Sequence, residues 1–219
     1  MIKCHQQDKA AHTKFISSLF SPTTLAPVFP VITPNEQFTI NQIDQTLSTT
    51  KDEEEVLEDN PLFFKKVFFR EGLVIGTCTG VVHSSPEELL AYNYLTKTHH
   101  ARESHIVANG QDNSKYPNNT IRTINDHHQI LYSCRKLPPP LKPREWLTRV
   151  IFQRVNEDTI KYFSTSIHDN DPDLPPSGFT KTTMTNIVRG VISIIHEYER
   201  LPQNQTRFTL RLKVDIKGR

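Results

Sequence analysis

The chain has 219 residues, 36% of them hydrophobic, enough for one domain with a substantial core and an extension. Its formal charge of +2 and pI near 8.4 come from mixed signs along the chain, so no basic surface for nucleic acid is expected. Three scattered cysteines, Cys4, Cys78 and Cys134, exclude a disulfide framework and are typical of a reduced protein. Without an apolar leader or a run of about 18 apolar residues, the sequence predicts a cytoplasmic protein.

The N-terminal third predicts an arm followed by a helix. Residues 1–34 mix Thr, Ser, Pro and isolated apolar residues without a period, so we expect a mobile arm. A domain is expected over residues 35–219. At its start, apolar residues recur about one helical turn apart, at Phe38, Ile40, Ile43 and Leu47. The acidic run at 51–55 is expected to face solvent.

A hairpin and a second helix come next. Residues 62–70 and 73–82 are apolar runs joined by Glu71-Gly72, and such a short connection containing glycine predicts a β-hairpin. Ser85 then precedes Pro86 and two glutamates, the pattern of an N-terminal helix cap. The helix is expected to extend to about Thr96.

The remainder of the chain predicts an antiparallel sheet. Strands are expected at 118–126, 128–136, 146–154, 159–167, 186–200 and 207–216, where β-branched and aromatic residues cluster. In the last of these, Phe208, Leu210 and Leu212 alternate with Thr209 and Arg211, so one side is apolar and the other faces water. An α+β domain follows from this order.

Three motifs occur in a specific order along the chain. They are Gly80-Val-Val-His-Ser-Ser-Pro-Glu-Glu-Leu-Leu-Ala91, then the proline corner Leu137-Pro-Pro-Pro-Leu-Lys-Pro-Arg-Glu-Trp-Leu147, then Thr206-Arg-Phe-Thr-Leu-Arg-Leu-Lys-Val-Asp-Ile-Lys-Gly218. Their order resembles the START (StAR-related lipid-transfer) domain family. The resemblance implies a helix-grip fold, in which a curved antiparallel sheet with an N-terminal helix and a short helix after the second strand grips a long C-terminal helix. Family members continue into that helix where this chain ends, so we expect it to be missing here.

The resemblance implies non-enzymatic binding, and transfer between membranes, of a lipid held in an apolar tunnel between sheet and helices. If Trp146 faces inward, strand alternation turns Thr148, Val150 and Phe152 inward as well, and Leu147, Arg149, Ile151 and Gln153 outward. The candidate lipid-binding residues are Tyr132, Trp146, Thr148, Val150, Phe152, Ile192, Ile194, Phe208, Leu210 and Leu212. For any single residue among Trp146, Phe152, Phe208 and Leu212, plain core packing is favoured over ligand contact, because apolar lining and apolar packing look identical in sequence.

The motif arginine, Arg144, is expected to be a structural anchor at the proline corner. Sterol-transporting members of the family carry a buried arginine six residues after the motif arginine, and this chain has Val150 there. The resemblance therefore implies a phospholipid or another acyl lipid rather than a sterol, taken up during transient contact with a membrane surface.

Two other functions remain open at this stage. The same fold with a filled core would serve as a docking or regulatory module. An enzyme of the related cyclase type would need converging polar groups, for which Tyr132, His196 and Tyr198 are the candidates.

No metal, cofactor or catalytic thiol is expected. The adjacent pairs His99-His100 and His127-His128 would point to opposite faces of a strand, and Cys134 has no accompanying nucleophile motif.

Overall fold

The computed structural model describes residues 10–17, 30–48, 55–60, 63–70, 73–95, 117–137, 139–176, 178–179 and 186–215. The pair His99-His100, and whatever follows Asp215, lie outside these ranges, so the expected absence of a C-terminal helix stays a prediction. No helix in the described part of the chain is long and apolar enough to cross a membrane.

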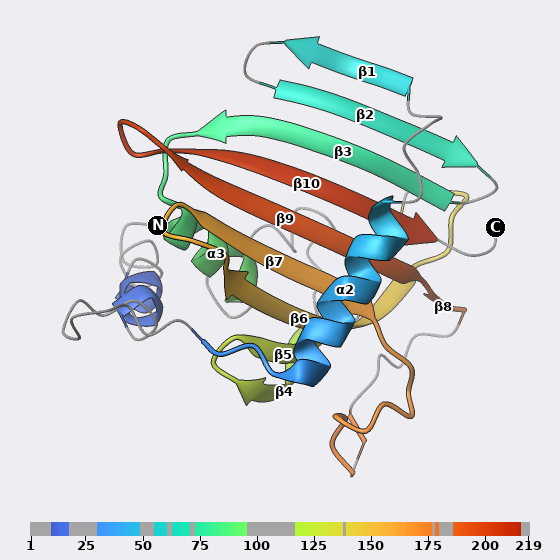
Figure 1. Cartoon of the computed structure of the whole chain (residues 1–219). Helices are drawn as coiled ribbons and strands as arrows, with labels where there is room; N and C mark the ends of the chain where they lie inside the picture. Colours follow the sequence, from blue (N-terminus) through green and yellow to red (C-terminus); the bar gives the residue numbers. More distant parts are fainter. Residues whose placement is uncertain are drawn as a thin grey trace.

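The described residues form one ten-stranded sheet with the order β1-β2-β3-β10-β9-β7-β6-β5-β4, and these neighbours are antiparallel (Figure 1). The strands are β1 (Glu55–Asn60), β2 (Phe63–Arg70), β3 (Leu73–Val82), β4 (Asn118–Asn125), β5 (His128–Arg135), β6 (Arg144–Arg154), β7 (Thr159–Ser166), β8 (Val188–Arg189), β9 (Val191–Leu201) and β10 (Gln205–Asp215). Strand β8 lies off this path and pairs with β6 in parallel. The expected antiparallel sheet is confirmed. Strand β1 was not expected. Because of it, the short helix follows the third strand of the chain and not, as the sequence predicted, the second.

Two labelled helices accompany the sheet, α2 (Pro34–Ser48) and α3 (Pro86–Tyr94). Ser85 caps α3 as predicted: its hydroxyl accepts from Glu88 N at 3.2 Å, and the Glu88 carboxylate accepts from Ser85 N at 3.0 Å. Thr33 and Glu36 form the same capping box at the start of α2. In both helices a local sequence signal therefore sets the first turn.

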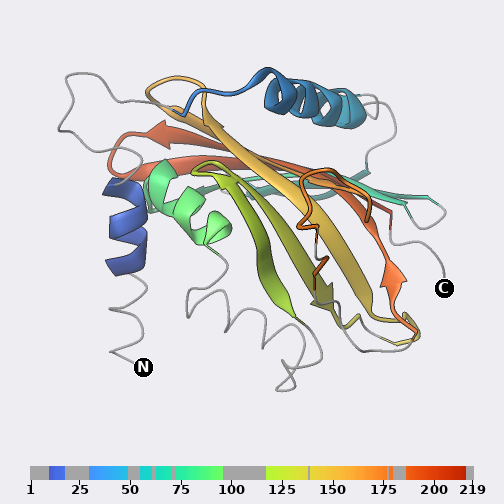
Figure 2. The same cartoon turned by 90° about the horizontal axis from the view of Figure 1, so that it is seen from below.

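The sheet is an arch that separates the two helices. Seen edge-on, α2 lies over its convex side and α3 lies on its concave side (Figure 2). Since residues directly opposite in antiparallel strands point to the same side, the pairing register assigns every strand residue to one of these two faces.

Helix α2 and a loop cover the part of the convex face where strand alternation placed the outward-facing residues Leu147 and Ile151. Helix α2 packs Ile40, Ile43 and Leu47 against Ile151, Phe163 and Ile195. Leu147 also lies on this face and is fully buried, in a cluster with Leu174. Leu147 and Ile151 thus face away from Trp146 as strand alternation predicts. They are nevertheless core residues, because a helix and a loop cover them.

The register of α2 differs from the simple periodic pattern. Phe38 was grouped with the apolar positions, yet it is 63% exposed, whereas Glu36 is only 3% exposed. Hydrogen bonds to Glu36 from Asn125, His127 and His128 of the β4–β5 hairpin explain why a carboxylate occupies a buried position of this helix.

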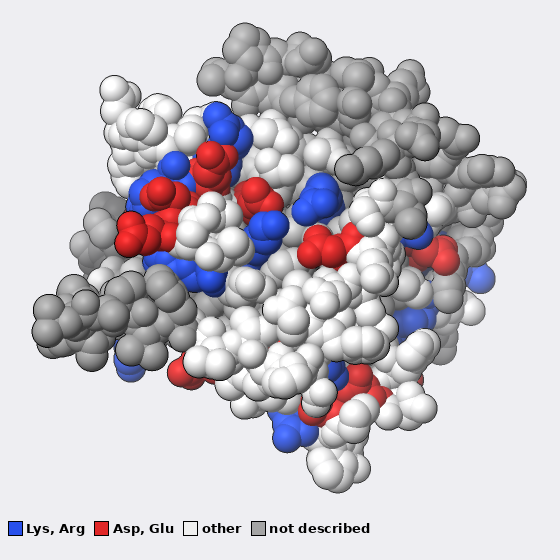
Figure 3. Space-filling model, in the orientation of Figure 1, with Lys and Arg blue, Asp and Glu red and all other residues white. Residues whose placement is uncertain are grey.

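Solvent-facing positions further along the convex face carry paired charges. Lys161 lies 3.1 Å from Glu197 across β7 and β9, and Arg207 lies 2.7 Å from Glu199 across β10 and β9. Figure 3 shows both signs intermixed over this face of the molecule. The wet side predicted for the last strand is confirmed at β10.

The strand expected over 186–200 is divided at Gly190. Upstream, β8 pairs with β6, and downstream, β9 pairs with β7 and β10. A Cβ atom on Gly190 would lie 2.5 Å from Trp146 Nε1, so the backbone passes against the indole at this point. The chain changes partners where only glycine fits.

Residues 10–17, within the segment expected to be a mobile arm, are helical. Phe15 stacks on Tyr94 with ring centroids 5.4 Å apart and meets Phe152 edge-on at 6.1 Å. This places the aromatic side chain against the concave-side core. The division into an arm, 1–34, and a domain, 35–219, stays a prediction.

Candidate functional site

The concave face carries side chains from five adjacent strands in continuous rows. One row is formed by Val150, Ser164, Ile194, Leu212 and Gly76, each directly opposite the next. A second is formed by Phe152, Tyr162, His196, Leu210 and Cys78. The rows run from β6 across β7, β9 and β10 to β3, so one surface joins segments far apart in the sequence.

Every candidate lipid-binding residue except Tyr132 lies on this concave face. Trp146 and Thr148 share it with Val150 and Phe152 along β6, while Ile192 and Phe208 extend it along β9 and β10. Strand alternation from Trp146, combined with the observed register, brings them together.

Tyr132 lies on the opposite face. It pairs with Leu147, and its hydroxyl donates to the Glu145 carboxylate in a buried contact. The sequence assigned its side incorrectly because the facing of β5 depends on its register with β6, which the isolated strand pattern does not contain. Tyr132 also lies across the sheet from His196 and Tyr198, so the three polar groups considered for an enzyme are not assembled.

The concave face is most deeply buried beside α3. Val150 is fully buried and Phe152 is 1% exposed, in a cluster with Leu90 and Tyr94 of α3. Further along the face, Ile192, Ile194, Leu210 and Leu212 are each only partly buried. The face thus passes from a closed end at α3 to a more open apolar stretch over β9 and β10.

Aromatic side chains with polar tips gather at the closed end. The rings of Tyr162 and His196 meet edge-on at 5.2 Å, and His196 lies 5.9 Å from Tyr198. Tyr94 belongs to the same buried cluster as Tyr162 and Tyr198. We call these four side chains, Tyr94, Tyr162, His196 and Tyr198, the tyrosine–histidine cluster.

Burial keeps this cluster uncharged. It raises the pKa of Tyr94, Tyr162 and Tyr198 above the ordinary tyrosine range, and it lowers the pKa of His196 to about 4. The hydroxyls of Tyr94 and Tyr198 are buried and have no hydrogen-bond partner within the described part of the chain. A buried polar group left without a partner costs roughly 1–3 kcal/mol, so these two hydroxyls need an explanation.

Charged groups near α3 are already paired with one another. Glu87 accepts from Arg200 Nη2 at 2.6 and 2.7 Å and from Arg154 Nη1 at 3.1 Å. Arg154 also donates to the backbone carbonyls of Asn156 and Glu157. This network ties α3 to β6 and β9 and occupies the guanidinium donors.

At the other end of β6, Arg144 is fully buried and donates from Nη1 to the carbonyl of Lys142 within the proline corner. The backbone of β8 pairs alongside it. These contacts agree with an anchoring role, and that role stays a prediction.

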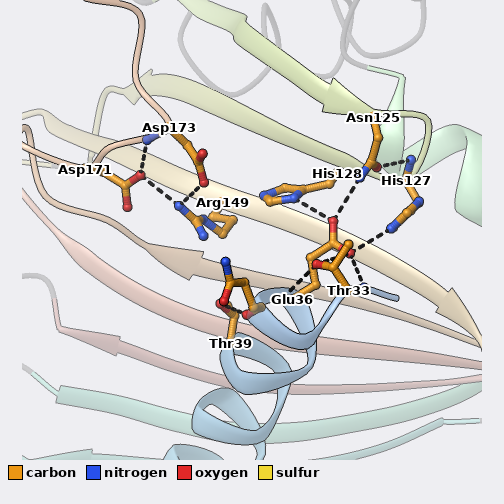
Figure 4. A network of polar contacts seen from close by, with 10 residues as sticks. Thr33, Glu36, Thr39, Asn125, His127, His128, Arg149, Asp171 and Asp173 are labelled. Carbon is orange, nitrogen blue, oxygen red and sulfur yellow. Dashed lines mark hydrogen bonds and ion pairs between the residues drawn. The ribbon is translucent and has the colours of Figure 1, made fainter. Parts of the chain in front are cut away.

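A polar network fastens α2 to the convex face (Figure 4). The Glu36 carboxylate accepts from Asn125 Nδ2 at 3.0 Å, from His128 Nδ1 at 2.8 Å and from Thr33 N at 2.8 Å, and His127 Nε2 lies 3.2 Å from it. Burial by itself would raise the pKa of Glu36, but the hydrogen bonds from Thr33, Asn125 and His127 outweigh it and lower that pKa to about 2. An ionised carboxylate at this position binds the β4–β5 turn to the helix.

The adjacent histidines meet the same carboxylate because His127 lies in the turn and only His128 lies in the strand. Burial lowers the pKa of His128, which keeps its ring neutral. Within the described ranges, no group of three or more His, Cys, Asp or Glu side chains is arranged to hold a metal ion. The pair instead has a structural role.

A groove of about 840 Å³ lies between α2 and the loop after β7. Arg149 at its floor donates from Nη2 to Asp171 at 2.8 Å and to Asp173 at 2.7 Å, which fixes the loop (Figure 4). Among the residues that line the groove, Glu36 binds Asn125 and His128, and Arg149 binds Asp171 and Asp173. These contacts hold α2 and the loop against the sheet.

Sequence reasoning missed Tyr94, Tyr162 and Glu36. Tyr94 lies in an expected helix and Tyr162 in an expected strand, but no local sequence feature shows that these two elements pack together. Glu36 follows Thr33 by three residues, the spacing of a capping box, and that signal could have marked it as an ordered residue.

Several solved structures share the fold of this chain. The human StarD13 (DLC2) lipid transfer and protein localization domain is 13% identical, with 82% of this chain and 83% of that chain aligned and a TM-score of 0.53. Human StAR-related lipid transfer protein 5 is 14% identical over 84% and 83% of the two chains, with a TM-score of 0.54. Human STARD10 is 17% identical over 86% and 70%, with a TM-score of 0.56. No protein-family model matches the sequence, and no curated protein matches it.

The arched sheet with its flanking helices is therefore a START-type helix-grip fold. This confirms the fold that the three sequence motifs indicated. At these identities the comparison defines the fold, and the function has to be argued from the concave face.

Proposed function

We propose that this protein binds a lipid on the concave face of its sheet and carries it between membranes without chemical change. The observation that carries the proposal is the pair of side-chain rows from β6 to β3, which contain no charged residue. The structural neighbours whose names include lipid transfer support it.

The driving force is removal of hydrocarbon from water. Each buried CH₂ group contributes about 0.8 kcal/mol, so an acyl chain lying along Ile192, Ile194, Leu210 and Leu212 would gain several kcal/mol. These side chains are only partly buried by the protein itself, so they have surface left to bury against a ligand. Binding of this kind needs no catalytic residue and no cofactor.

The ligand proposed is an acyl lipid in preference to a sterol. Val150, at the place where sterol-transporting relatives carry a buried arginine, is fully buried beside Phe152 and offers no charge. We place the protein in the cytoplasm, in transient contact with membrane surfaces.

Native mass spectrometry tests the proposal, after incubation of the protein with mixed-lipid vesicles. The informative variant is Leu212→Trp, which adds bulk to the concave face where Leu212 pairs with Ile194 and Gly76. Lys213→Trp adds the same bulk at the next position of β10, on the convex side, and is the matched control. We expect retained lipid in the natural protein and in the control, and a clear reduction with Leu212→Trp.

Retention of no lipid by the natural protein would instead support a docking or regulatory module with a filled core. Equal retention by all three proteins would show that lipid binds elsewhere. Thermal unfolding of each variant checks that lost binding does not reflect lost folding.

A further inference from the structure

The tyrosine–histidine cluster lies at the closed end of the same face. Tyr94 reaches it from α3, Tyr162 from β7, and His196 and Tyr198 from β9. Beyond it along β9 and β10, the face continues as Ile194, Ile192 and their apolar partners. An elongated ligand on this face would therefore have one end among hydroxyls and a ring nitrogen, and the rest on hydrocarbon.

Two of these polar groups are built in without protein partners. Tyr198 is 1% exposed and Tyr94 is 5% exposed, and neither hydroxyl is hydrogen-bonded to any described residue. A phenylalanine would pack the same ring without a buried orphan hydroxyl, so packing alone does not account for tyrosine at both positions. A ligand group that forms hydrogen bonds with the two hydroxyls would explain why both positions are tyrosine.

The charge at this end limits the ligand further. Desolvation keeps the tyrosines protonated and lowers the pKa of His196 to about 4, so the cluster is neutral at physiological pH. The guanidinium groups of Arg154 and Arg200, at the ends of the strands beside this cluster, are bound to Glu87. Among the residues that the structure describes, a phosphate or carboxylate placed here would find no counter-charge that is not already paired, and an unpaired buried anion is strongly disfavoured.

We propose that the tyrosine–histidine cluster receives the uncharged, hydroxyl-bearing end of an acyl lipid, such as a monoacylglycerol, with the acyl chain directed along β9 and β10. This inference rests on the proposed function and narrows it from acyl lipids in general to those with a neutral polar end. The hydroxyls of Tyr94 and Tyr198 bind that end directly.

The test compares two lipids that differ only in a phosphate, 1-oleoylglycerol and oleoyl lysophosphatidic acid, offered at equal amounts in phosphatidylcholine vesicles. Native mass spectrometry reports which is retained, and octadecene serves as a probe without a polar end. The variants are Tyr94→Phe and Tyr198→Phe. Tyr92→Phe, on the exposed side of α3, is the control.

We expect 1-oleoylglycerol to be retained in preference to its phosphate. Each cluster variant should lower its affinity by about tenfold, as loss of one buried hydrogen bond implies, with octadecene binding and thermal stability maintained. Retention of lipid with no preference for the neutral form, and with no effect of either variant, would overturn this inference and leave the proposed function standing. Retention of none of these lipids would contradict both.

Discussion

Gly190 lies directly against the indole of Trp146: a Cβ atom at Gly190 would stand 2.5 Å from Nε1 and 3.0 Å from Cε2. This contact occurs where β8 ends and β9 begins, and it joins the proline corner to the strands of the concave face. Since the indole is stiff and largely buried, it has little room to yield.

Gly190→Ala is therefore expected to destabilise the protein by about 1–3 kcal/mol, the usual cost of overpacking. Urea unfolding measures the loss, and the fluorescence of Trp146, the single tryptophan, reports a displaced ring. Because Phe is smaller than Trp, the double variant Gly190→Ala with Trp146→Phe should recover part of the stability lost by Gly190→Ala relative to Trp146→Phe alone. An alanine variant as stable as the natural protein would show that the contact is loose.

Glu36 should make the protein sensitive to acid. Its pKa is about 2 in the folded state and about 4.5 when unperturbed, so the unfolded chain binds the proton first as the pH falls. The stabilisation is complete above pH 4.5 and is lost as the pH falls toward 2, by roughly 3 kcal/mol for a shift of this size.

Urea unfolding at several pH values checks this. Glu36→Gln should reduce stability at pH 7 and flatten the dependence between pH 4.5 and 2. Asp44→Asn changes an acid on the same helix that is half exposed, and it should leave the steep part of the curve in place. An unchanged curve for Glu36→Gln would mean that another carboxylate is responsible.

His196 predicts a second pH dependence, at higher pH. Burial lowers its pKa from 6.5 to about 4, so the unfolded state takes up the proton first between these values. The stabilisation should be complete above pH 6.5 and should be lost as the pH is lowered from 6.5 to 4, by roughly 3 kcal/mol for a shift of this size.

His196→Gln keeps a polar side chain that does not titrate, so it should remove this loss. The comparison is the difference in unfolding free energy between pH 7 and pH 4.5 for each protein. Since His128 also has a lowered pKa, part of the dependence will persist in the variant. A variant with the full dependence of the natural protein would contradict the assignment to His196.

Cys134 should be inert toward alkylation in the folded protein. It is fully buried, and burial, with a smaller effect of Glu145, raises the pKa of its thiol to about 12. Since the thiolate is the reactive species, iodoacetamide at pH 8 should modify Cys134 at least about a hundredfold more slowly than in urea. Peptide mapping by mass spectrometry gives the rate, with Cys78, which is partly exposed, followed in the same sample. Rapid modification of Cys134 in the native protein would contradict this prediction and would favour a catalytic or redox role for that thiol.

The sequence by itself determined the features that depend on neighbours in the chain. The cap at Ser85 and the alternation from Phe208 to Leu212 each need only a few consecutive residues, and both are present as predicted. The order of the three motifs indicated the START-type fold through their resemblance to that family.

Only the tertiary structure decided which residues meet. Tyr132 lies on the convex face because it pairs with Leu147 of β6. Glu36 is buried because Asn125 and His128 of the β4–β5 hairpin, far away in sequence, supply hydrogen bonds to its carboxylate. Likewise, Tyr94 and Tyr198 belong to one cluster because α3 packs against the concave face of the sheet. Local periodicity specifies which side chains of a strand share a face. What covers that face, and which polar groups it encloses, follows from long-range packing that no single segment encodes.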